Sequence, residues 1–246
     1  MKIGFYILFA IVTIGCLTGR LVEGDLASQL DYIFKPLLMP LLMIYWYWQT
    51  KDNKNAFTKL ILAALVFAWG GDVALMFARD GAITIKLYFM LGLGSFLIMQ
   101  LIYSLAYQQA PDIENSALKR SPKIVAPFVI IGWGFYAFAF PELENVVMKI
   151  AVFIYINAII VMVGYSLDRK WRVSERSFKL VFFGAAIFMA SDLMIGIDRF
   201  VIPDFPYSGF FIMVTYILAQ VLIVEGALLQ HNENFIPDEE MIPDDL

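Results

Sequence analysis

The chain has 246 residues, of which 61% are hydrophobic and 16% charged, and its formal net charge is −4. Soluble domains are about 45–50% apolar, so this composition and the mean hydropathy of +0.73 indicate an integral membrane protein. Its only cysteine, Cys16, excludes an internal disulfide, and its only histidine, His231, excludes a zinc site built on several histidines. No basic patch with interleaved aromatic residues indicates nucleic-acid binding.

Apolar segments of about 20 residues, the length that a helix needs to cross the hydrocarbon core, recur along the chain. Because no linker separates soluble domains, we predict one all-α membrane bundle of eight transmembrane helices within residues 1–230. Residues 231–246 are acidic and are predicted to form a flexible C-terminal tail. The predicted helices are residues 3–22, 29–48, 58–77, 83–106, 123–140, 143–166, 177–198 and 207–229.

The first of these segments also has features of a cleaved leader. Lys2 precedes its apolar run, and Gly15-Cys16 resembles the cleavage site of a lipoprotein. Such sites have Leu three residues before the cysteine, where this chain has Thr13. We therefore expect a retained first helix; cleavage at Cys16 is the alternative and leaves seven spans.

Lys and Arg residues fall unequally on the two sides of the predicted bundle. Twelve lie on one side, in Lys2 and in the connections after the second, fourth and sixth helices, and five lie on the opposite side. Cytoplasmic loops carry the excess of Lys and Arg. We therefore predict that both termini are cytoplasmic, with the protein in the cytoplasmic (inner) membrane if the chain is bacterial.

Two aspartates lie inside apolar segments, Asp72 in FAWGGDVALMF and Asp192 in FMASDLMIGID. A charge at the centre of a membrane helix costs roughly 2.5–3.5 kcal/mol on insertion scales, so such residues indicate function by default. An arginine follows each aspartate after seven residues, Arg79 or Arg199, and lies about two turns along nearly the same helix face. The alternative is a structural role, in which the aspartates pair with Lys35 or a backbone donor.

In the predicted orientation, Asp72, Asp192 and Lys35 fall within roughly 6–9 Å of the non-cytoplasmic boundary of the membrane. They predict a pocket that opens toward that side. Arg79 and Arg199 lie above it, where they either contact a phosphate or anchor their helices at the interface. Lys35 either forms a structural ion pair or contacts the ligand directly.

The motifs G-D-x6-R and S-D-x6-R lie 120 residues apart, in the third and seventh predicted helices. Helices 1–4 and 5–8 can therefore be interpreted as two parallel four-helix repeats. The same shift takes Lys35 to Tyr155, which is two residues from Asn157, a polar position in the predicted sixth helix. Asn157 is therefore a candidate substrate-binding residue, with an interhelical hydrogen bond as its alternative role.

The candidate residues favour acid–base chemistry. The sequence has no G-x-S-x-G motif, no serine with a partner histidine and no cluster of metal-ligand residues, so we predict neither a nucleophilic triad nor a metal site. Two carboxyl groups in one low-dielectric pocket share a proton more readily than both ionise. One then donates a proton while the other activates water. We prefer Asp192 as the acid, because its neighbours Met189, Ala190 and Leu193 are apolar.

Three short motifs resemble the YhhN family of eight-helix membrane proteins, which contains the lysoplasmalogenases: FKPLLMPLL, GGDVALM and ASDLMIG. The count and order of the apolar segments extend this resemblance over nearly the whole chain, up to Gln230. The family's motif aspartates match Asp72 and Asp192, and its Lys-Pro matches Lys35-Pro36. The resemblance implies hydrolysis of the vinyl ether bond of a lysoplasmalogen, which gives a fatty aldehyde and glycerophosphoethanolamine or glycerophosphocholine.

The implied reaction needs a neutral carboxylic acid, a carboxylate and a water molecule, so we expect no cofactor. The expected partners are a lysophospholipid substrate, water and the surrounding membrane lipids. The main alternative is a proton-coupled transporter, which also uses acidic residues within the membrane. The other alternative is a lipid-binding protein with the same pocket and no chemistry.

Overall fold

A computed structural model of the chain describes residues 2–22, 24–79, 82–203 and 205–233, without the side chains of residues 2, 79 and 82–86. These residues form nine α-helices, and no β-strand occurs among them. The α-helices are α1 (Lys2–Gly19), α2 (Asp25–Thr50), α3 (Ala56–Met76), α4 (Ala82–Gln108), α5 (Ala117–Arg120), α6 (Ala126–Ala139), α7 (Val146–Asp168), α8 (Glu175–Gly196) and α9 (Ser208–Glu233). Short 3-10 helices η1 (Phe77–Arg79), η2 (Ile113–Asn115), η3 (Pro122–Val125) and η4 (Phe140–Glu142) and a π-helix η5 (Ile197–Val201) border them.

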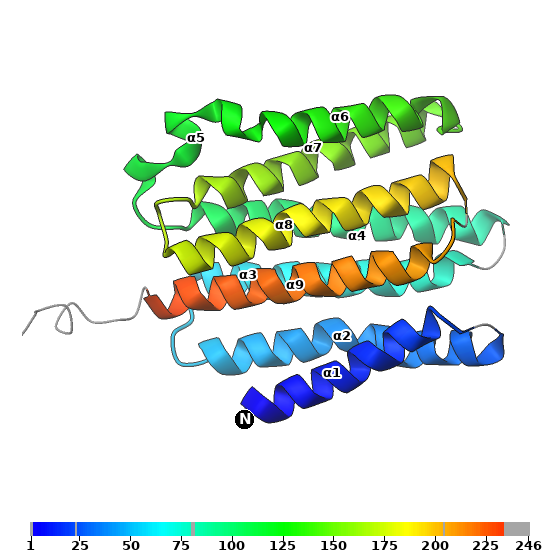
Figure 1. The fold of residues 1–246 in the computed structure, drawn as a ribbon, viewed down its shortest axis with the longest axis horizontal. Coiled ribbons are helices and arrows are strands. Elements are labelled where there is room, and N and C mark those ends of the chain that lie inside the picture. The colour runs from blue at the N-terminus through cyan, green and yellow to red at the C-terminus, as the bar shows by residue number, and fades with distance from the viewer. Residues whose placement is uncertain (1, 23, 80–81, 204, 234–246) are drawn as a thin grey trace, which may run out of the picture.

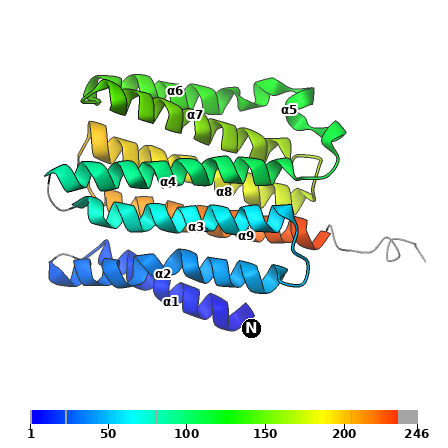
Figure 2. The same cartoon turned by 180° about the vertical axis from the view of Figure 1, so that it is seen from behind.

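The long helices lie side by side along one common direction (Figure 1). Helices α8 and α9 form one face of the bundle, and α3 and α4 form the opposite face, as the view from behind confirms (Figure 2). Helices α6 and α7 lie at one edge of these two layers, and α1 and α2 lie at the other. The core of the protein therefore lies between the α3–α4 pair and the α8–α9 pair.

The prediction of an all-α membrane bundle is confirmed in its coarse form. Within the described residues, six helices are long and apolar enough to cross a membrane. Helix α2 is also long but carries Asp25, Asp31 and Lys35, and the apolar part of α1 is shorter, Ile3–Gly19. The count of eight spans therefore stays a prediction, and the four-residue helix α5 was not predicted at all. The six spans are Ala56–Met76, Leu87–Gln108, Pro122–Glu142, Val146–Asp168, Glu175–Val201 and Ser208–Glu233.

The outer surface of the bundle carries large apolar side chains. Ile130 on α6 is 72% exposed, and Val146 and Val147 at the start of α7 are 68% and 69% exposed. Water would not stabilise so many exposed aliphatic and aromatic side chains, whereas lipid chains do. The exposed surface and the apolar helices together identify a multi-pass membrane protein.

Two prolines loosen α2 beside Lys35. Pro40 has no N–H group, so the carbonyl of Pro36 lacks its partner within the helix. The indole Nε1 of Trp69, on α3, donates a hydrogen bond of 3.0 Å to this carbonyl. The interrupted backbone of α2 is thereby fixed to the helix that carries Asp72.

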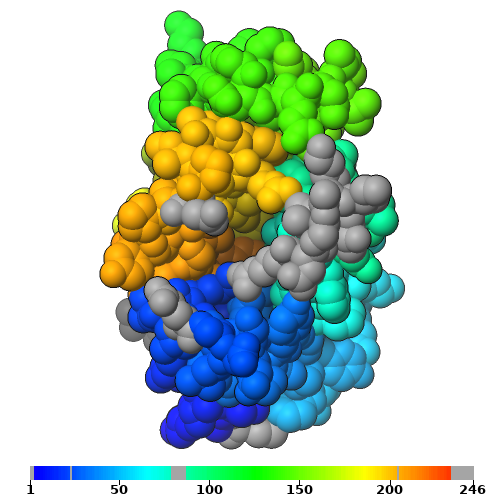
Figure 3. Space-filling view, turned by 90° about the vertical axis from the view of Figure 1, so that its right-hand side faces the viewer, coloured from blue at the N-terminus to red at the C-terminus, as the bar shows by residue number. Residues whose placement is uncertain are grey.

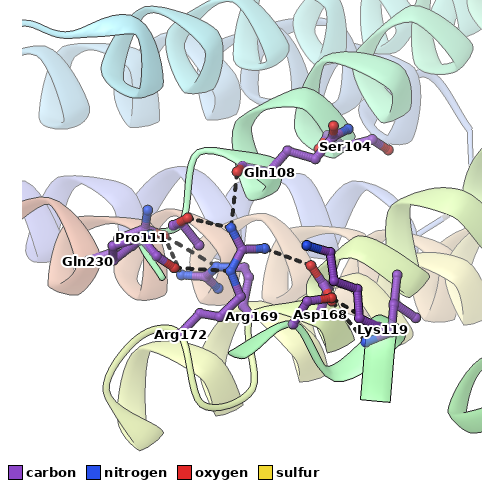
Figure 4. A network of polar contacts seen from close by, with 11 residues as sticks. Ser104, Gln108, Pro111, Lys119, Asp168, Arg169, Arg172 and Gln230 are labelled. Atoms are coloured by element: carbon purple, nitrogen blue, oxygen red, sulfur yellow. Dashed lines mark hydrogen bonds and ion pairs between the residues drawn. The ribbon is translucent and has the colours of Figure 1, made fainter. Parts of the chain in front are cut away.

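A buried polar network fixes the end of the bundle where α1 begins and α9 ends (Figure 4). The guanidinium of Arg172 forms an ion pair of 2.6 Å with Asp168 and donates to the carbonyls of Gln108, Ala110 and Pro111. The sequence indicated Arg172 only as a loop charge that sets orientation. The structure shows that this side chain also fastens the chain after α4 to the end of α7.

A second buried arginine joins the same end of the bundle to α9. Arg169 donates to the Oε1 of Gln230 at 2.8 Å (Figure 4) and also to the Oγ of Ser177 at 2.8 Å. Burial lowers the pKa of Arg169 to about 10, so its guanidinium keeps its charge at neutral pH. Helix α9 continues to Glu233, which is three residues past Gln230, the predicted end of the membrane domain. The rest of the predicted tail, residues 234–246, lies outside the described residues.

Candidate functional site

The candidate site lies at the end of the bundle opposite the start of α1 and the end of α9. Helices α3 and α8 end there, and α2, α4 and α9 begin there (Figure 1). Seen from this end, the surface has a central hollow between the α1–α2 end in blue and the α8–α9 end in yellow and orange (Figure 3). Asp72 is four residues from the end of α3, and Asp192 is four residues from the end of α8.

Asp72 is buried and is held by two other helices. Its carboxyl group accepts a hydrogen bond of 2.7 Å from the hydroxyl of Tyr216, on α9. The ammonium of Lys35, on α2, lies 4.0 Å from its other oxygen. Removing one partner of a buried ion pair leaves an uncompensated charge. Lys35 therefore stabilises the ionised form of Asp72.

Asp192 has neutral partners instead. Its Oδ2 accepts a hydrogen bond of 2.6 Å from the hydroxyl of Tyr155, on α7, and one of 3.1 Å from the amide of Gln100, on α4. No described residue donates a hydrogen bond to its Oδ1. This second oxygen is thus available for a proton or a ligand, while the first fixes the orientation of the carboxyl group.

The two aspartates border two adjoining pockets of different character. The first is apolar and holds about 580 Å³, including space open to solvent, and Asp192 is the only charged residue among the described residues that line it. The second holds about 830 Å³, including space open to solvent, and is lined by both aspartates and by further charged side chains. Asp192, Leu75, Phe89, Phe96 and Ile195 line both pockets, so the pockets meet beside Asp192.

The charged pocket contains some of the residues that the sequence indicated and lacks others. Lys35 and Arg199 line it together with the two aspartates. Arg79 is the last residue of η1, and its side chain lies outside the described residues. Asn157 lines neither pocket, and its amide donates a hydrogen bond of 2.7 Å to the carbonyl of Phe153 in its own helix.

Several residues of the site were not singled out from the sequence. Arg20 lines the charged pocket and forms an ion pair of 2.8 Å with Asp31, but the sequence indicated it only as a loop charge. The offset of 120 residues between the two motifs leads from Lys35 to Tyr155, but the sequence favours Asn157 as the binding residue because its side chain is more polar. Tyr216 gave no signal in the sequence, since tyrosine is common near membrane interfaces.

The contacts around the two aspartates follow a common scheme. Each aspartate takes one contact from the helix before it, Lys35 for Asp72 and Tyr155 for Asp192. Each takes a second from the other half of the chain, where Tyr216 on α9 serves Asp72 and Gln100 on α4 serves Asp192. The parallel repeat remains a prediction, but this scheme is the contact pattern that it implies.

The donors and acceptors of the site suit proton transfer. Two carboxyl groups, a lysine and the hydroxyl of Tyr216 belong to residues that line the charged pocket. The hydroxyl of Tyr155 and the amide of Gln100 donate to Asp192. Among the described residues, no group of three or more His, Cys, Asp or Glu side chains is placed to hold a metal ion. One carboxyl group has a cationic partner and the other has neutral partners, so their electrostatic environments differ.

Comparison with known proteins places this arrangement in a family. The chain is 31% identical over 175 residues to the lysoplasmalogenase TMEM86A of Bos taurus and 29% identical over 169 residues to the lysoplasmalogenase TMEM86A of Homo sapiens. Each match covers 68% of this chain but only 65% of the relative's own length. No solved structure matches the chain. Residues 30–227, which include both aspartates and Lys35, match the model of the YhhN family, and the chain belongs to that family.

Proposed function

We propose that the protein hydrolyses the vinyl ether bond of lysoplasmalogens, with Asp72 and Asp192 as the acid–base pair. The observation that carries this proposal is the meeting of an apolar pocket and a charged pocket beside Asp192. A lysoplasmalogen has the same two-part character, since its vinyl ether joins a long apolar chain to a charged glycerophosphate head. The activity in the names of the two curated relatives supports the same substrate class.

The substrate fits the pockets in one direction. Its hydrocarbon chain enters the apolar pocket, where Phe135, Val152 and Ile159 are among the lining residues. Its phosphate occupies the charged pocket, within reach of Arg20 and Arg199. Arginine offers paired N–H donors that match phosphate oxygens. The vinyl ether, which lies between the chain and the phosphate, is then placed at the junction beside Asp192.

The first chemical step is protonation of carbon by Asp192. Only neutral donors contact Asp192, and both use its Oδ2, so the proton resides on Oδ1 at the junction of the pockets. This proton moves to the β-carbon of the vinyl ether, and the α-carbon becomes an oxocarbenium ion conjugated to the ether oxygen. The carboxylate of Asp72, which Lys35 keeps ionised, stabilises the positive charge electrostatically.

The second step adds water to the cation. Asp72 accepts a proton from the attacking water as a new C–O bond forms at the α-carbon, which gives a hemiacetal. The hemiacetal hydroxyl then loses its proton to Asp192, and the glycerol oxygen leaves with the proton held by Asp72. The products are a fatty aldehyde and the glycerophospho-alcohol, and both carboxyl groups return to their starting states.

Phosphate recognition predicts a KM effect. We expect Arg199→Gln to raise KM about 10-fold with a smaller change in kcat, because the phosphate contact is equal in the ground and transition states. Steady-state kinetics on a lysoplasmalogen measures both constants. Lys149→Gln is the control. It also removes one positive charge at the same end of the bundle, but Lys149 lines neither pocket. An unchanged KM in Arg199→Gln would leave Arg199 as an interfacial anchor only.

We also propose that all eight long helices cross the membrane, with both termini cytoplasmic and the charged pocket open to the non-cytoplasmic side. The twelve-to-five distribution of basic residues supports this orientation. Activity reporters fused after residue 230 and inserted in the connection between α4 and α6 should then report the cytoplasmic side. Signals from opposite sides of the membrane would mean that the number of crossing helices is wrong.

Aldehyde formation separates this proposal from its alternatives. Purified protein should release aldehyde from a lysoplasmalogen, which neither a transporter nor a lipid-binding protein does. A transporter would instead accumulate an unchanged solute in proteoliposomes. Both acidic residues lie at one end of the bundle, whereas a proton-coupled carrier needs access from both sides, so hydrolysis is the better-supported function.

A further inference from the structure

The charged pocket has a third carboxylate that the proposed reaction does not use. Asp198 lies in η5, the π-helix that follows α8, and lines the pocket with Asp72 and Asp192. Its Oδ1 is buried and accepts no hydrogen bond from any described residue. An unpaired buried acceptor costs free energy, and the cost is larger for a charged group. A ligand with an N–H group can supply the donor that this atom lacks.

Asp198 lines the pocket from within a π-helical turn. On a regular α-helix, Asp198 would lie about 240° around the axis from Asp192, because six residues turn the chain by about 100° each. Asp198 is the second residue of η5, and Asp192, Asp198 and Arg199 all line the same pocket. π-Helical turns inside α-helices are frequent at functional sites.

The nearby cations are engaged with other partners. The guanidinium of Arg20 pairs with Asp31 at 2.8 Å, and the ammonium of Lys35 lies 4.0 Å from Asp72. The guanidinium of Arg199 lies over the ring of Phe89, 5.1 Å from its centroid. No ion pair joins any of these described side chains to Asp198. The pocket thus offers cationic groups and, separately, the carboxylate of Asp198, whose Oδ1 has no donor among the described residues.

We propose that Asp198 binds the primary ammonium of an ethanolamine head group and makes the pocket selective for lysophosphoethanolamine lipids over lysophosphocholine lipids. The proposal rests on the proposed function in taking a lysoglycerophospholipid as the ligand. The ammonium of ethanolamine is two carbons from the phosphate, so a pocket with cations and one carboxylate is complementary to the whole zwitterion. A primary ammonium has three N–H donors, as the lysine side chain has, and supplies the hydrogen bond that the buried Oδ1 lacks. A trimethylammonium group has no N–H and leaves that oxygen unpaired.

Binding of non-hydrolysable lipids tests this selectivity. The probes are 1-O-alkyl lysolipids, which lack the vinyl double bond, with phosphoethanolamine, phosphocholine or phosphate as the head group. Their affinities are measured with the full-length protein in detergent micelles. We expect the wild type to bind the ethanolamine lipid about 10-fold more tightly than the choline lipid, because a hydrogen bond to a charged group contributes about 1.5–3 kcal/mol.

Substitution of Asp198 should remove this preference. Asp198→Asn is expected to weaken binding of the ethanolamine lipid by about 10-fold to 100-fold, and to leave binding of the phosphate lipid unchanged or tighter. Asp25→Asn is the matched control, since Asp25 is an exposed aspartate in the first turn of α2 at the same end of the bundle. The control should bind all three lipids as the wild type does.

Two results would overturn the assignment. One is an Asp198→Asn protein that keeps the wild-type ratio of affinities for the ethanolamine and phosphate lipids. The other, which needs no variant, is a wild type that binds the ethanolamine and choline lipids equally well. Because the probes are not hydrolysed, these affinities report head-group recognition whether or not the protein has the proposed activity. Failure to release aldehyde from any vinyl ether would instead contradict the proposed function alone.

Discussion

Asp72→Asn and Asp192→Asn are each expected to lower kcat by about 10²–10⁴-fold, the usual contribution of general acid–base catalysis. Asparagine has nearly the shape of aspartate, and its carbonyl oxygen still accepts the hydrogen bond from Tyr216 or from Tyr155. It neither donates a carboxyl proton nor accepts one from water. Loss of either role stops a reaction that needs both, so the double variant should be little slower than each single one.

The control for these variants is another carboxyl group within the bundle. Glu225, on α9, accepts a hydrogen bond of 2.9 Å from the hydroxyl of Tyr6 and lines neither pocket. Glu225→Gln should therefore keep wild-type turnover. Steady-state rates of aldehyde release from a lysoplasmalogen compare the wild type, the two single variants, the double variant and Glu225→Gln. Near-normal kcat in a folded Asp72→Asn or Asp192→Asn protein would remove that aspartate from the mechanism.

The largest loss of stability is expected at the opposite end of the bundle, for Arg172→Leu. This substitution removes the buried partner of Asp168 and the donor to three backbone carbonyls (Figure 4). Breaking a buried ion pair by removing one partner costs about 3–5 kcal/mol, because the other charge stays buried and unpaired. The expected result is a much lower midpoint temperature of unfolding in detergent.

The single buried cysteine gives a direct readout of this unfolding. Cys16 is fully buried in α1, so a thiol-reactive fluorophore should label it only as the bundle opens. Arg176→Leu removes the same charge from an exposed position in α8 and should unfold near the wild-type temperature. Asp168→Asn added to Arg172→Leu should recover part of the lost stability, since no buried charge is then left unpaired. Equal midpoint temperatures of unfolding for Arg172→Leu and Arg176→Leu would contradict this stabilising role of Arg172.

The sequence located the helices and the two aspartates because the membrane makes both signals strong. A helix needs about 20 apolar residues to cross the hydrocarbon, and a carboxylate among them stands out. Eight of the nine described α-helices lie in the predicted segments, shifted by several residues at their ends. Helix α5 was missed because its four residues, ALKR, lie in a polar connection with no apolar period.

Residues whose roles depend on helix rotation were harder to predict. Tyr155 and Asn157 are two residues apart and so point about 200° apart around α7. Only one of them can face Asp192, and the hydrogen bond of 2.6 Å shows that it is Tyr155. Periodicity did not distinguish them, because the helix is apolar on nearly every side and polarity alone favoured Asn157.

Residues brought to the site by tertiary structure gave the weakest signals. Arg20 ends up in the charged pocket because the chain after α1 turns back into α2, where Asp31 fixes the guanidinium. Asp198 lines the same pocket from a π-helical turn, whereas the spacing of seven residues between Asp192 and Arg199 is interpreted with a regular α-helix. Neither effect follows from the local pattern of residues.

The most direct test of the proposed reaction is to identify its products in D₂O. Purified protein is incubated with a lysoplasmalogen carrying an ethanolamine head group, and the products are analysed by mass spectrometry. Protonation of the β-carbon followed by addition of water predicts glycerophosphoethanolamine and a fatty aldehyde that carries one deuterium at the carbon next to its carbonyl. The Asp72→Asn and Asp192→Asn proteins should form neither product at a comparable rate. An unchanged lipid after incubation with folded wild-type protein, or an aldehyde that carries no deuterium, would contradict the account.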